Sequence, residues 1–268
     1  MEVTPETSLL AKALWSIAIV LMLTFVAERV STRAAGLLSG APMTVLLLHY
    51  FVGVDKGTAF IIESIPHGIA SFSATLAFLL GYYAVSTLPM RFTAVTGALT
   101  GCIAFVAVAA VLAEIPFTIP SALTLTLLIA GFSVWLFRHI KFARVEQPVR
   151  YTTRLLLLRG TFTGLLLVSV IGLAQLLGPR WTGLLGGFPA TLLPTVLILH
   201  LTYGTTSTHN VVRNFPVGLG AILLYMLSAP VTLSRWGLVG GIVISLAISV
   251  AYLSVIMLWS ARRDRRVA

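Results

Sequence analysis

Apolar runs of about 20 residues recur along the whole chain, and short polar or basic segments separate them. A helix of that length crosses a hydrocarbon core ~30 Å thick. The strict alternation of apolar and polar residues that is typical of outer-membrane strands is absent. The pattern therefore predicts an all-α integral membrane protein. Its nine predicted transmembrane segments cover residues 8–28, 35–54, 66–87, 90–113, 119–138, 154–177, 183–204, 216–233 and 236–260.

Composition supports this class, and the basic residues orient the chain. Hydrophobic residues make up 58% of the 268 residues and charged residues 10%, which leaves too little charge for a soluble surface. The net charge of +10 does not predict a nucleic-acid partner, because Lys and Arg lie between the apolar runs and at the C-terminus. The terminal sequence ARRDRR predicts a cytoplasmic C-terminus, and nine crossings then put the N-terminus outside. Fourteen Lys and Arg residues fall on the cytoplasmic side and four outside.

The chain contains one motif twice, as TVLLLHYFVG at residues 44–53 and TVLILHLTYG at residues 195–204. Glycines and prolines upstream match in the same order: Gly36 with Gly183, Gly40 with Gly187, and Pro42 with Pro189. Each copy has four predicted spans, and the fifth span has no counterpart, so this single extra crossing inverts the second copy. We predict a four-span repeat, a linker helix with a basic loop, and an inverted four-span repeat, over residues 1–115, 116–152 and 153–268.

The first copy resembles a known family. Its sequence AGLLSGAPMTVLLLHYFVGVDKG, and HYFVG at residues 49–53 above all, is similar to the GlpM family of small bacterial inner-membrane proteins, whose members are about one repeat long. The likeness covers residues 8–113 and, more weakly, 154–260, where HLTYG replaces HYFVG. It implies a multi-pass protein of the bacterial inner membrane and carries no established activity. This chain departs from the family by having two copies, so a dimeric role of the family would be internal here.

The second and seventh spans are expected to be interrupted helices. Pro42 suits the first turn of a helix, and the 11 steps from Pro42 to Gly53 cover only ~17 Å. In the second copy the helix begins at Pro194, or at Pro189 with a kink at Pro194. Because the copies are inverted, both helices would begin near the membrane centre and direct their N-termini at one region.

Two converging helix N-termini predict a site for an anion. Each presents unpaired N–H groups and about half a positive charge. Glycines at the interruptions allow close backbone approach, and threonines add hydroxyl donors. The predicted substrate-binding residues are Gly40, Pro42, Thr44, Gly186, Gly187, Pro189, Thr191 and Thr195.

The acidic residues agree with an anionic substrate. All eight Asp and Glu residues fall at segment edges or in loops, whereas cation carriers usually hold a carboxylate within a span. The same pattern, together with histidines far apart in the expected fold, disfavours a membrane enzyme. We therefore predict no catalytic residues, no metal ion and no cofactor.

Four further residues match across the copies, and each pair has two interpretations. His49 and His200 are expected one turn before the ends of their half-helices, where they are either proton-responsive gates or histidines hydrogen-bonded inside the bundle. Lys12 and Arg159 either extend to the membrane interface or face the cavity and add charge for an anion. The polar stretch at residues 205–210 is expected to be a cytoplasmic loop with its histidine in solvent.

These expectations lead to one principal hypothesis and one alternative. The principal hypothesis is a secondary transporter that moves a small anionic or carboxylate-bearing solute by alternating access, with proton coupling left open. The alternative is a non-transporting membrane scaffold or accessory subunit of an envelope pathway. Expected partners are the solute and membrane lipids, and both a monomer and a homodimer fit the sequence.

Overall fold

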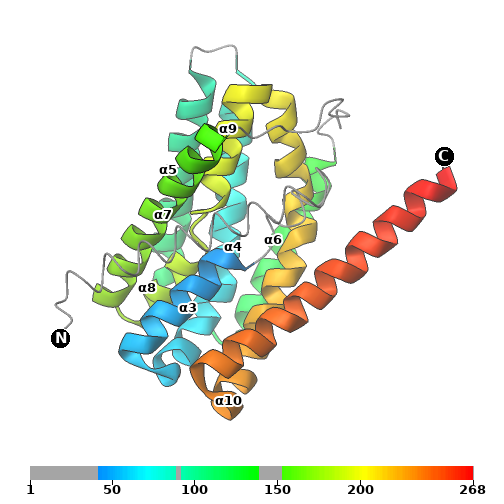
Figure 1. The fold of residues 1–268 in the computed structure, drawn as a ribbon. Coiled ribbons are helices and arrows are strands. Elements are labelled where there is room, and N and C mark those ends of the chain that lie inside the picture. The colour runs from blue at the N-terminus through cyan, green and yellow to red at the C-terminus, as the bar shows by residue number, and fades with distance from the viewer. Residues whose placement is uncertain (1–41, 89–91, 139–152, 268) are drawn as a thin grey trace.

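The computed structural model describes residues 42–88, 92–138 and 153–267, and all regular secondary structure in these ranges is helical. The helices lie side by side as a bundle (Figure 1). They are α3 (Met43–Lys56), α4 (Thr58–Ser86), α5 (Thr93–Ala113), α6 (Ile119–Phe137), α7 (Thr153–Leu176), α8 (Pro179–Gly186), α9 (Leu192–Tyr203) and α10 (Thr205–Val267). α10 consists of two helices that meet at Gly237, whose φ of 67° and ψ of −171° are not helical.

Within the described ranges, four helical stretches are long and apolar enough to cross a membrane. They are α4, α5, α6 and the part of α10 from Thr205 to Ile256. Shorter apolar helices are Gly160–Leu176 within α7 and the whole of α9. The prediction of a helical membrane protein is confirmed at this level. The predicted first span, residues 8–28, lies outside the described residues.

Several predicted boundaries were wrong because helices continue beyond the apolar runs. α4 begins at Thr58 instead of residue 66, and residues 205–210 form the first turns of α10 instead of a loop. One glycine joins each pair of helices: Gly57 between α3 and α4, with a φ of 87°, and Gly204 between α9 and α10, with a φ of 79°. Glycine tolerates this left-handed region, so the chain reverses in one residue and the polar ends stay helical.

The fifth predicted span matches α6 closely. Its start is fixed by a capping box, in which the Thr118 hydroxyl accepts from the Ser121 amide and the Ser121 hydroxyl accepts from the Thr118 amide. Pro120 occupies the first turn, where its missing N–H costs nothing. Farther along, the Thr126 hydroxyl donates to the carbonyl oxygen of Ile69, 2.8 Å away, which ties α6 to α4.

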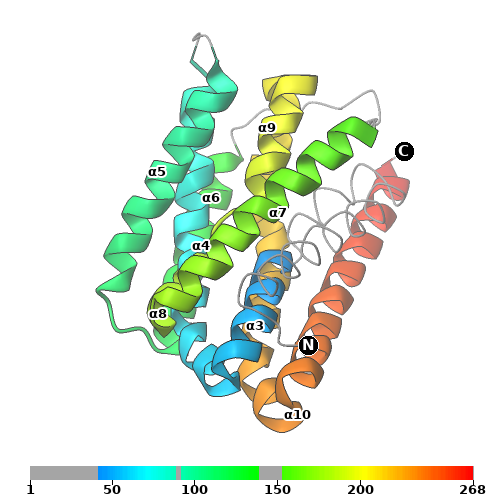
Figure 2. The same ribbon diagram turned by 60° about the vertical axis from the view of Figure 1, so that its left-hand side comes forward.

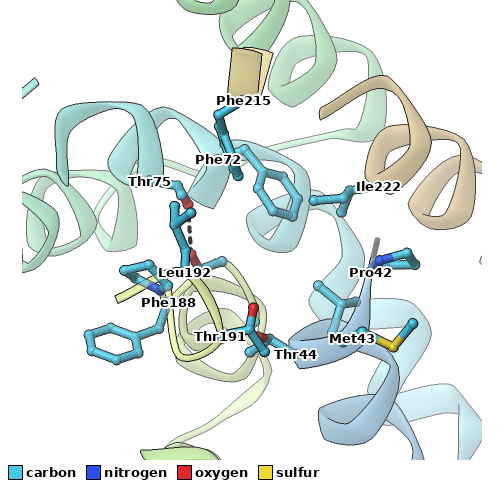
Figure 3. Close-up of a pocket in the computed structure, with 14 residues that line it drawn as sticks. Pro42, Met43, Thr44, Phe72, Thr75, Phe188, Thr191, Leu192, Phe215 and Ile222 are labelled. Atoms are coloured by element: carbon cyan, nitrogen blue, oxygen red, sulfur yellow. Dashed lines mark hydrogen bonds between the residues drawn. The ribbon is translucent and has the colours of Figure 1, made fainter. Parts of the chain in front are cut away.

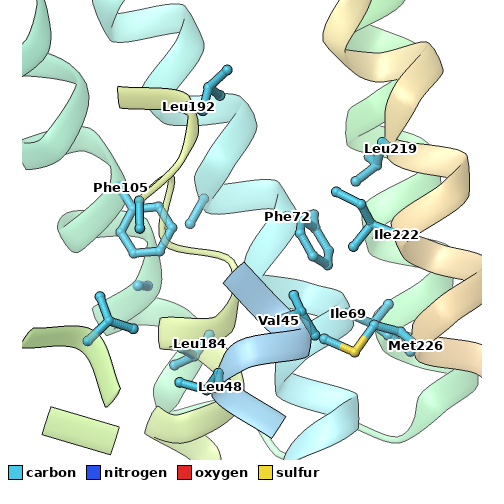
Figure 4. Close-up of a cluster of buried hydrophobic side chains, with 14 of the residues drawn as sticks. Val45, Leu48, Ile69, Phe72, Phe105, Leu184, Leu192, Leu219, Ile222 and Met226 are labelled. Carbon is cyan, nitrogen blue, oxygen red and sulfur yellow. The ribbon is translucent and has the colours of Figure 1, made fainter. Parts of the chain in front are cut away.

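α4 is the central helix of the bundle, and α5, α6, α8 and α10 pack around it (Figure 2). Side chains from both halves of the chain meet in a single buried cluster, part of which Figure 4 shows between α3, α4, α8 and α10. The labelled members from these helices are Val45, Leu48, Ile69, Phe72, Leu184, Leu219, Ile222 and Met226.

Small residues let α8 and α5 approach α4 closely. A Cβ atom placed on Gly183 of α8 would lie 2.2 Å from the carbonyl oxygen of Ser64 and 2.7 Å from the amide nitrogen of Gly68. On the α5 side, a Cβ on Gly101 would lie 2.8 Å from the carbonyl oxygen of Phe78. Close backbone contact of this kind drives helix association in membranes, where lipid is as apolar as leucine. α8 and α5 are therefore held at short distances from α4.

Candidate functional site

The chain between α8 and α9 is an interruption in the predicted seventh span. α8 ends in a tight turn, in which the amides of Gly187 and Phe188 donate to the carbonyl oxygens three residues earlier, at Leu184 and Leu185. Pro189 then has no N–H with which to continue the helix. Regular hydrogen bonding resumes where the Leu193 amide donates to the Pro189 carbonyl oxygen, 2.7 Å away. The predicted interruption is therefore present.

A side chain of α4 fixes the position of this interruption. The Thr75 hydroxyl donates to the carbonyl oxygen of Gly187 over 2.6 Å. Gly187 packs directly against Ser71, because a Cβ placed on it would lie 2.1 Å from the Ser71 hydroxyl oxygen. The segment between α8 and α9 thus lies on α4 and cannot shift without breaking this contact.

α3 begins in the same region. The Leu46 amide donates to the carbonyl oxygen of Pro42, 2.7 Å away, and no described side chain caps this helix start. From here α3 runs toward one end of the molecule, whereas α9 runs toward the opposite end (Figure 1, Figure 2). The N-termini of two oppositely directed helices therefore lie near each other in the middle of the bundle.

A small cavity lies between these two helix starts (Figure 3). The space open to the centres of water molecules is about 30 Å³, and the void extends a further water radius beyond those centres. α4 and the first helix of α10 form its opposite side. The cavity is lined by Pro42, Met43, Thr44, Val45, Phe72, Thr75, Gly186, Gly187, Phe188, Pro189, Thr191, Leu192, Phe215 and Ile222.

Six of the eight residues predicted to bind the solute line this one cavity: Pro42, Thr44, Gly186, Gly187, Pro189 and Thr191. Thr195 does not line it, because it lies a turn farther into α9, where its hydroxyl donates to the carbonyl oxygen of Thr191 over 2.7 Å. Gly40 lies outside the described residues. The structure thus brings together residues from two distant segments that the repeat had paired.

Sequence reasoning missed the opposite wall. Phe72 and Thr75 come from α4, and Phe215 and Ile222 come from α10. The small and polar run GIASFSAT at residues 68–75 was a usable signal, because it is unusual within an apolar span. No comparable signal marks Phe215 or Ile222, which look like ordinary membrane-helix residues.

The unpaired polar groups at the cavity are mainly donors. Each helix start presents amides that have no partner within its own helix and about half a positive charge. The end of α8 also points here, but its carbonyl oxygens at Leu184 and Leu185 accept backbone amides, and that of Gly187 accepts Thr75. Within the described lining, no side chain carries a charge. The arrangement therefore presents more hydrogen-bond donors than acceptors to the cavity.

Each repeated histidine is hydrogen-bonded to a tyrosine from the other half of the chain. His49 is buried on α3, and its Nδ1 lies 3.3 Å from the Tyr225 hydroxyl oxygen of α10. The Nδ1 of His200 lies 2.6 Å from the Tyr82 hydroxyl oxygen of α4, and its Nε2 lies 3.2 Å from the Thr93 hydroxyl oxygen. The two histidines lie on half-helices that run to opposite ends of the bundle (Figure 2).

Two statements about histidine position need correction. His49 is not one turn from the end of its helix, because α3 continues for seven residues to Lys56. His209 is not solvated, because it is half-buried on helical residues of α10. Its Nε2 lies 2.8 Å from the Ser86 hydroxyl oxygen, and its ring meets Tyr83 edge-on. Both predictions were wrong because the helices extend beyond the apolar runs from which they were predicted.

The matched basic pair cannot be placed. Lys12 lies outside the described residues, and so does the side chain of Arg159, whose backbone belongs to α7. Both interpretations of this pair, extension to the interface and a position facing the cavity, therefore stay predictions.

Comparison with known proteins adds no relative: no protein-family model, no curated protein and no solved structure matches the chain. The resemblance to the GlpM family, which the sequence at residues 35–57 carries, therefore stays a prediction.

Proposed function

We propose that the protein is a secondary transporter that moves a small anionic or carboxylate-bearing solute across the bacterial inner membrane by alternating access. One observation carries the proposal: the N-termini of α3 and α9, which run in opposite directions, line the same cavity. Discontinuous helices whose N-termini face a shared site near the bilayer midplane are a recurring design of such transporters.

We further propose nine spans in two inverted repeats, with the N-terminus outside and the C-terminus cytoplasmic. Backbone conformation supports this. Gly57 and Gly204 follow the two half-helices with similar dihedral angles, a φ of 87° with a ψ of 167° and a φ of 79° with a ψ of 178°. Phe92, between α4 and α5, and Gly237, between the two helices of α10, both have positive φ, 62° and 67°. Two related halves could exchange inward-open and outward-open shapes about a fixed site.

Uptake into proteoliposomes tests the proposal. Purified protein is reconstituted, and uptake of radiolabelled acetate, phosphate, sulfate and chloride is compared with that of sodium and tetramethylammonium, with protein-free liposomes as the baseline. We expect saturable uptake of at least one anion and none of the cations. Conductance without saturation would indicate a channel. Failure to move any of the anions, by protein that elutes as a single species, would overturn the proposal in favour of the scaffold.

The histidine–tyrosine pairs are the proposed gates, one on each half-helix. In the tautomer in which neutral His200 accepts at Nδ1 from the Tyr82 hydroxyl, protonation makes Nδ1 a donor and the bond reverses, with the tyrosine oxygen accepting. A bond that changes direction with protonation state suits a gate. The same bond in a purely structural role would affect folding alone.

Tyr82→Phe is therefore expected to slow uptake about fivefold to tenfold, since losing a hydrogen bond of about 1 kcal/mol in one gate state changes its population by that factor. The measurement is the initial rate for whichever anion of the panel is taken up fastest, together with the thermal unfolding midpoint. Tyr225→Phe should act in the same way at the other gate. Tyr50→Phe, at an exposed neighbour of His49, is the control and should keep the normal rate. A lower midpoint with an unchanged rate would show a structural role only.

A further inference from the structure

The helix ends at the cavity can balance one negative charge at most. The two helix N-termini supply about half a positive charge each, and the described lining contains no Lys, Arg or His to supply more. A dianion would leave about one negative charge uncompensated in a low-dielectric interior, where unpaired charge is costly. The carbonyl oxygens at the end of α8 add no demand for a cation, because Gly187, Leu184 and Leu185 already accept hydrogen bonds.

A hydroxyl without a protein partner points to the same ligand. Thr44 is only 7% exposed and lines the cavity, yet its side chain makes no hydrogen bond with any described residue. Its oxygen is not among the fully buried unpartnered oxygens of the described residues, so it is accessible from the cavity, where a ligand or water can accept its hydrogen bond. Thr191 lies beside it at the start of α9 (Figure 3) and does not cap its own helix. Two hydroxyl donors on neighbouring helix starts suit the two oxygens of one carboxylate.

Apart from Thr75, the opposite wall of the cavity is apolar. Phe72 of α4 and Phe215 and Ile222 of α10 face the two helix starts (Figure 3). A ligand held by its charged group at the helix starts would therefore rest its other end against hydrocarbon. Since the space open to water centres is only about 30 Å³, a short aliphatic end suits the cavity better than a long one.

From these three features we infer that the cavity takes a monocarboxylate with a short aliphatic chain, of which isobutyrate is an example. This inference rests on the proposed function and narrows its substrate class. Inorganic phosphate, sulfate and dicarboxylates fit poorly because of their second charge. Halides fit poorly because they leave the apolar wall in contact with water or empty space.

Three ligands of nearly the same shape test the inference by thermal unfolding of the full-length protein in detergent, at constant ionic strength and pH 7.5. Isobutyrate carries one charge, isobutyramide carries none, and methylmalonate replaces one methyl group of isobutyrate by a second carboxylate. A ligand that binds only the folded protein raises its stability by RT ln(1 + [L]/Kd). We expect a saturable rise with isobutyrate and an apparent Kd at least tenfold weaker for the other two.

Matched variants locate the binding. Thr44→Val keeps the shape of the side chain and removes the hydroxyl, so it should weaken isobutyrate binding at least fivefold. Thr191→Val is a second variant of the same kind, for use if the first does not fold. Thr124→Val is the control, because Thr124 is exposed on α6 and its hydroxyl bonds to its own helix at Pro120.

Each of the other outcomes contradicts a specific part of the inference or the proposed function. If methylmalonate binds as tightly as isobutyrate and depends on Thr44, the inference of a single charge is wrong, while anion transport stands. If isobutyramide binds equally well, the charge argument is wrong. If none of the three stabilises the folded protein but an inorganic anion is taken up by proteoliposomes, the inference fails alone. If no anion is taken up either, the proposed function fails with it.

Discussion

Gly183→Ala is expected to destabilise the protein by about 2–3 kcal/mol, a large effect for one methyl group. The new Cβ would lie 2.2 Å from the Ser64 carbonyl oxygen and 2.7 Å from the Gly68 amide nitrogen. Both contacts are with backbone atoms of α4, so no side chain can rotate away and α8 itself must move. The measurement is the apparent thermal unfolding midpoint in detergent at a fixed scan rate, since membrane proteins often unfold irreversibly.

Gly172→Ala provides the matched control on α7. A Cβ at Gly172 meets nothing within 4 Å, and alanine is favoured over glycine inside a helix by about 0.5–1 kcal/mol. Its midpoint should therefore stay the same or rise, opposite in sign to Gly183→Ala. If Gly183→Ala unfolds at the wild-type midpoint, α8 does not pack on α4 as closely as the structure has it.

The interruption between α8 and α9 was predictable because local chemistry determines it. The sequence Gly186-Gly187-Phe188-Pro189 contains two glycines, which destabilise a helix, and a proline, which cannot donate the next backbone hydrogen bond. The meeting of this interruption with Pro42 was also predictable, because the repeated motif paired the two segments. In both cases the signal lies in a few adjacent residues or in a direct match between copies.

The partners of these segments were not predictable in the same way. Phe72 and Ile222 line the cavity only because α4 and α10 pack beside it, and their apolar spans would look the same facing lipid. The tyrosine partners of the two repeated histidines were not predictable either. When Pro66 is aligned with Pro216, Tyr225 corresponds to Thr75, so the two tyrosines do not occupy matching positions in the repeat. Tertiary packing determines both the cavity wall and the partners of the histidines, and no local sequence pattern indicates that packing.

Gly187→Leu is expected to abolish uptake while the protein still inserts into the membrane. Gly187 lines the cavity, and its carbonyl oxygen accepts the hydrogen bond from Thr75. A Cβ at this position would lie 2.1 Å from the hydroxyl oxygen and 2.6 Å from the Cβ of Ser71. The side chain would therefore push the interruption away from α4, separate the start of α9 from that of α3, and fill part of the cavity. The measurement is proteoliposome uptake, together with membrane yield and elution profile.

Two comparisons make this result specific to the cavity. Gly131→Leu adds the same bulk to α6, where a Cβ meets nothing within 4 Å, and should retain full uptake. Gly187→Ala is a smaller change at the same site, and should reduce uptake without abolishing it if the displacement of α9 grows with side-chain size. Normal uptake by well-folded Gly187→Leu would mean that the solute passes elsewhere, because the two helix starts cannot keep their present spacing with a leucine between α9 and α4. Loss of uptake in Gly131→Leu as well would trace the effect to added bulk in general and remove the argument for this cavity.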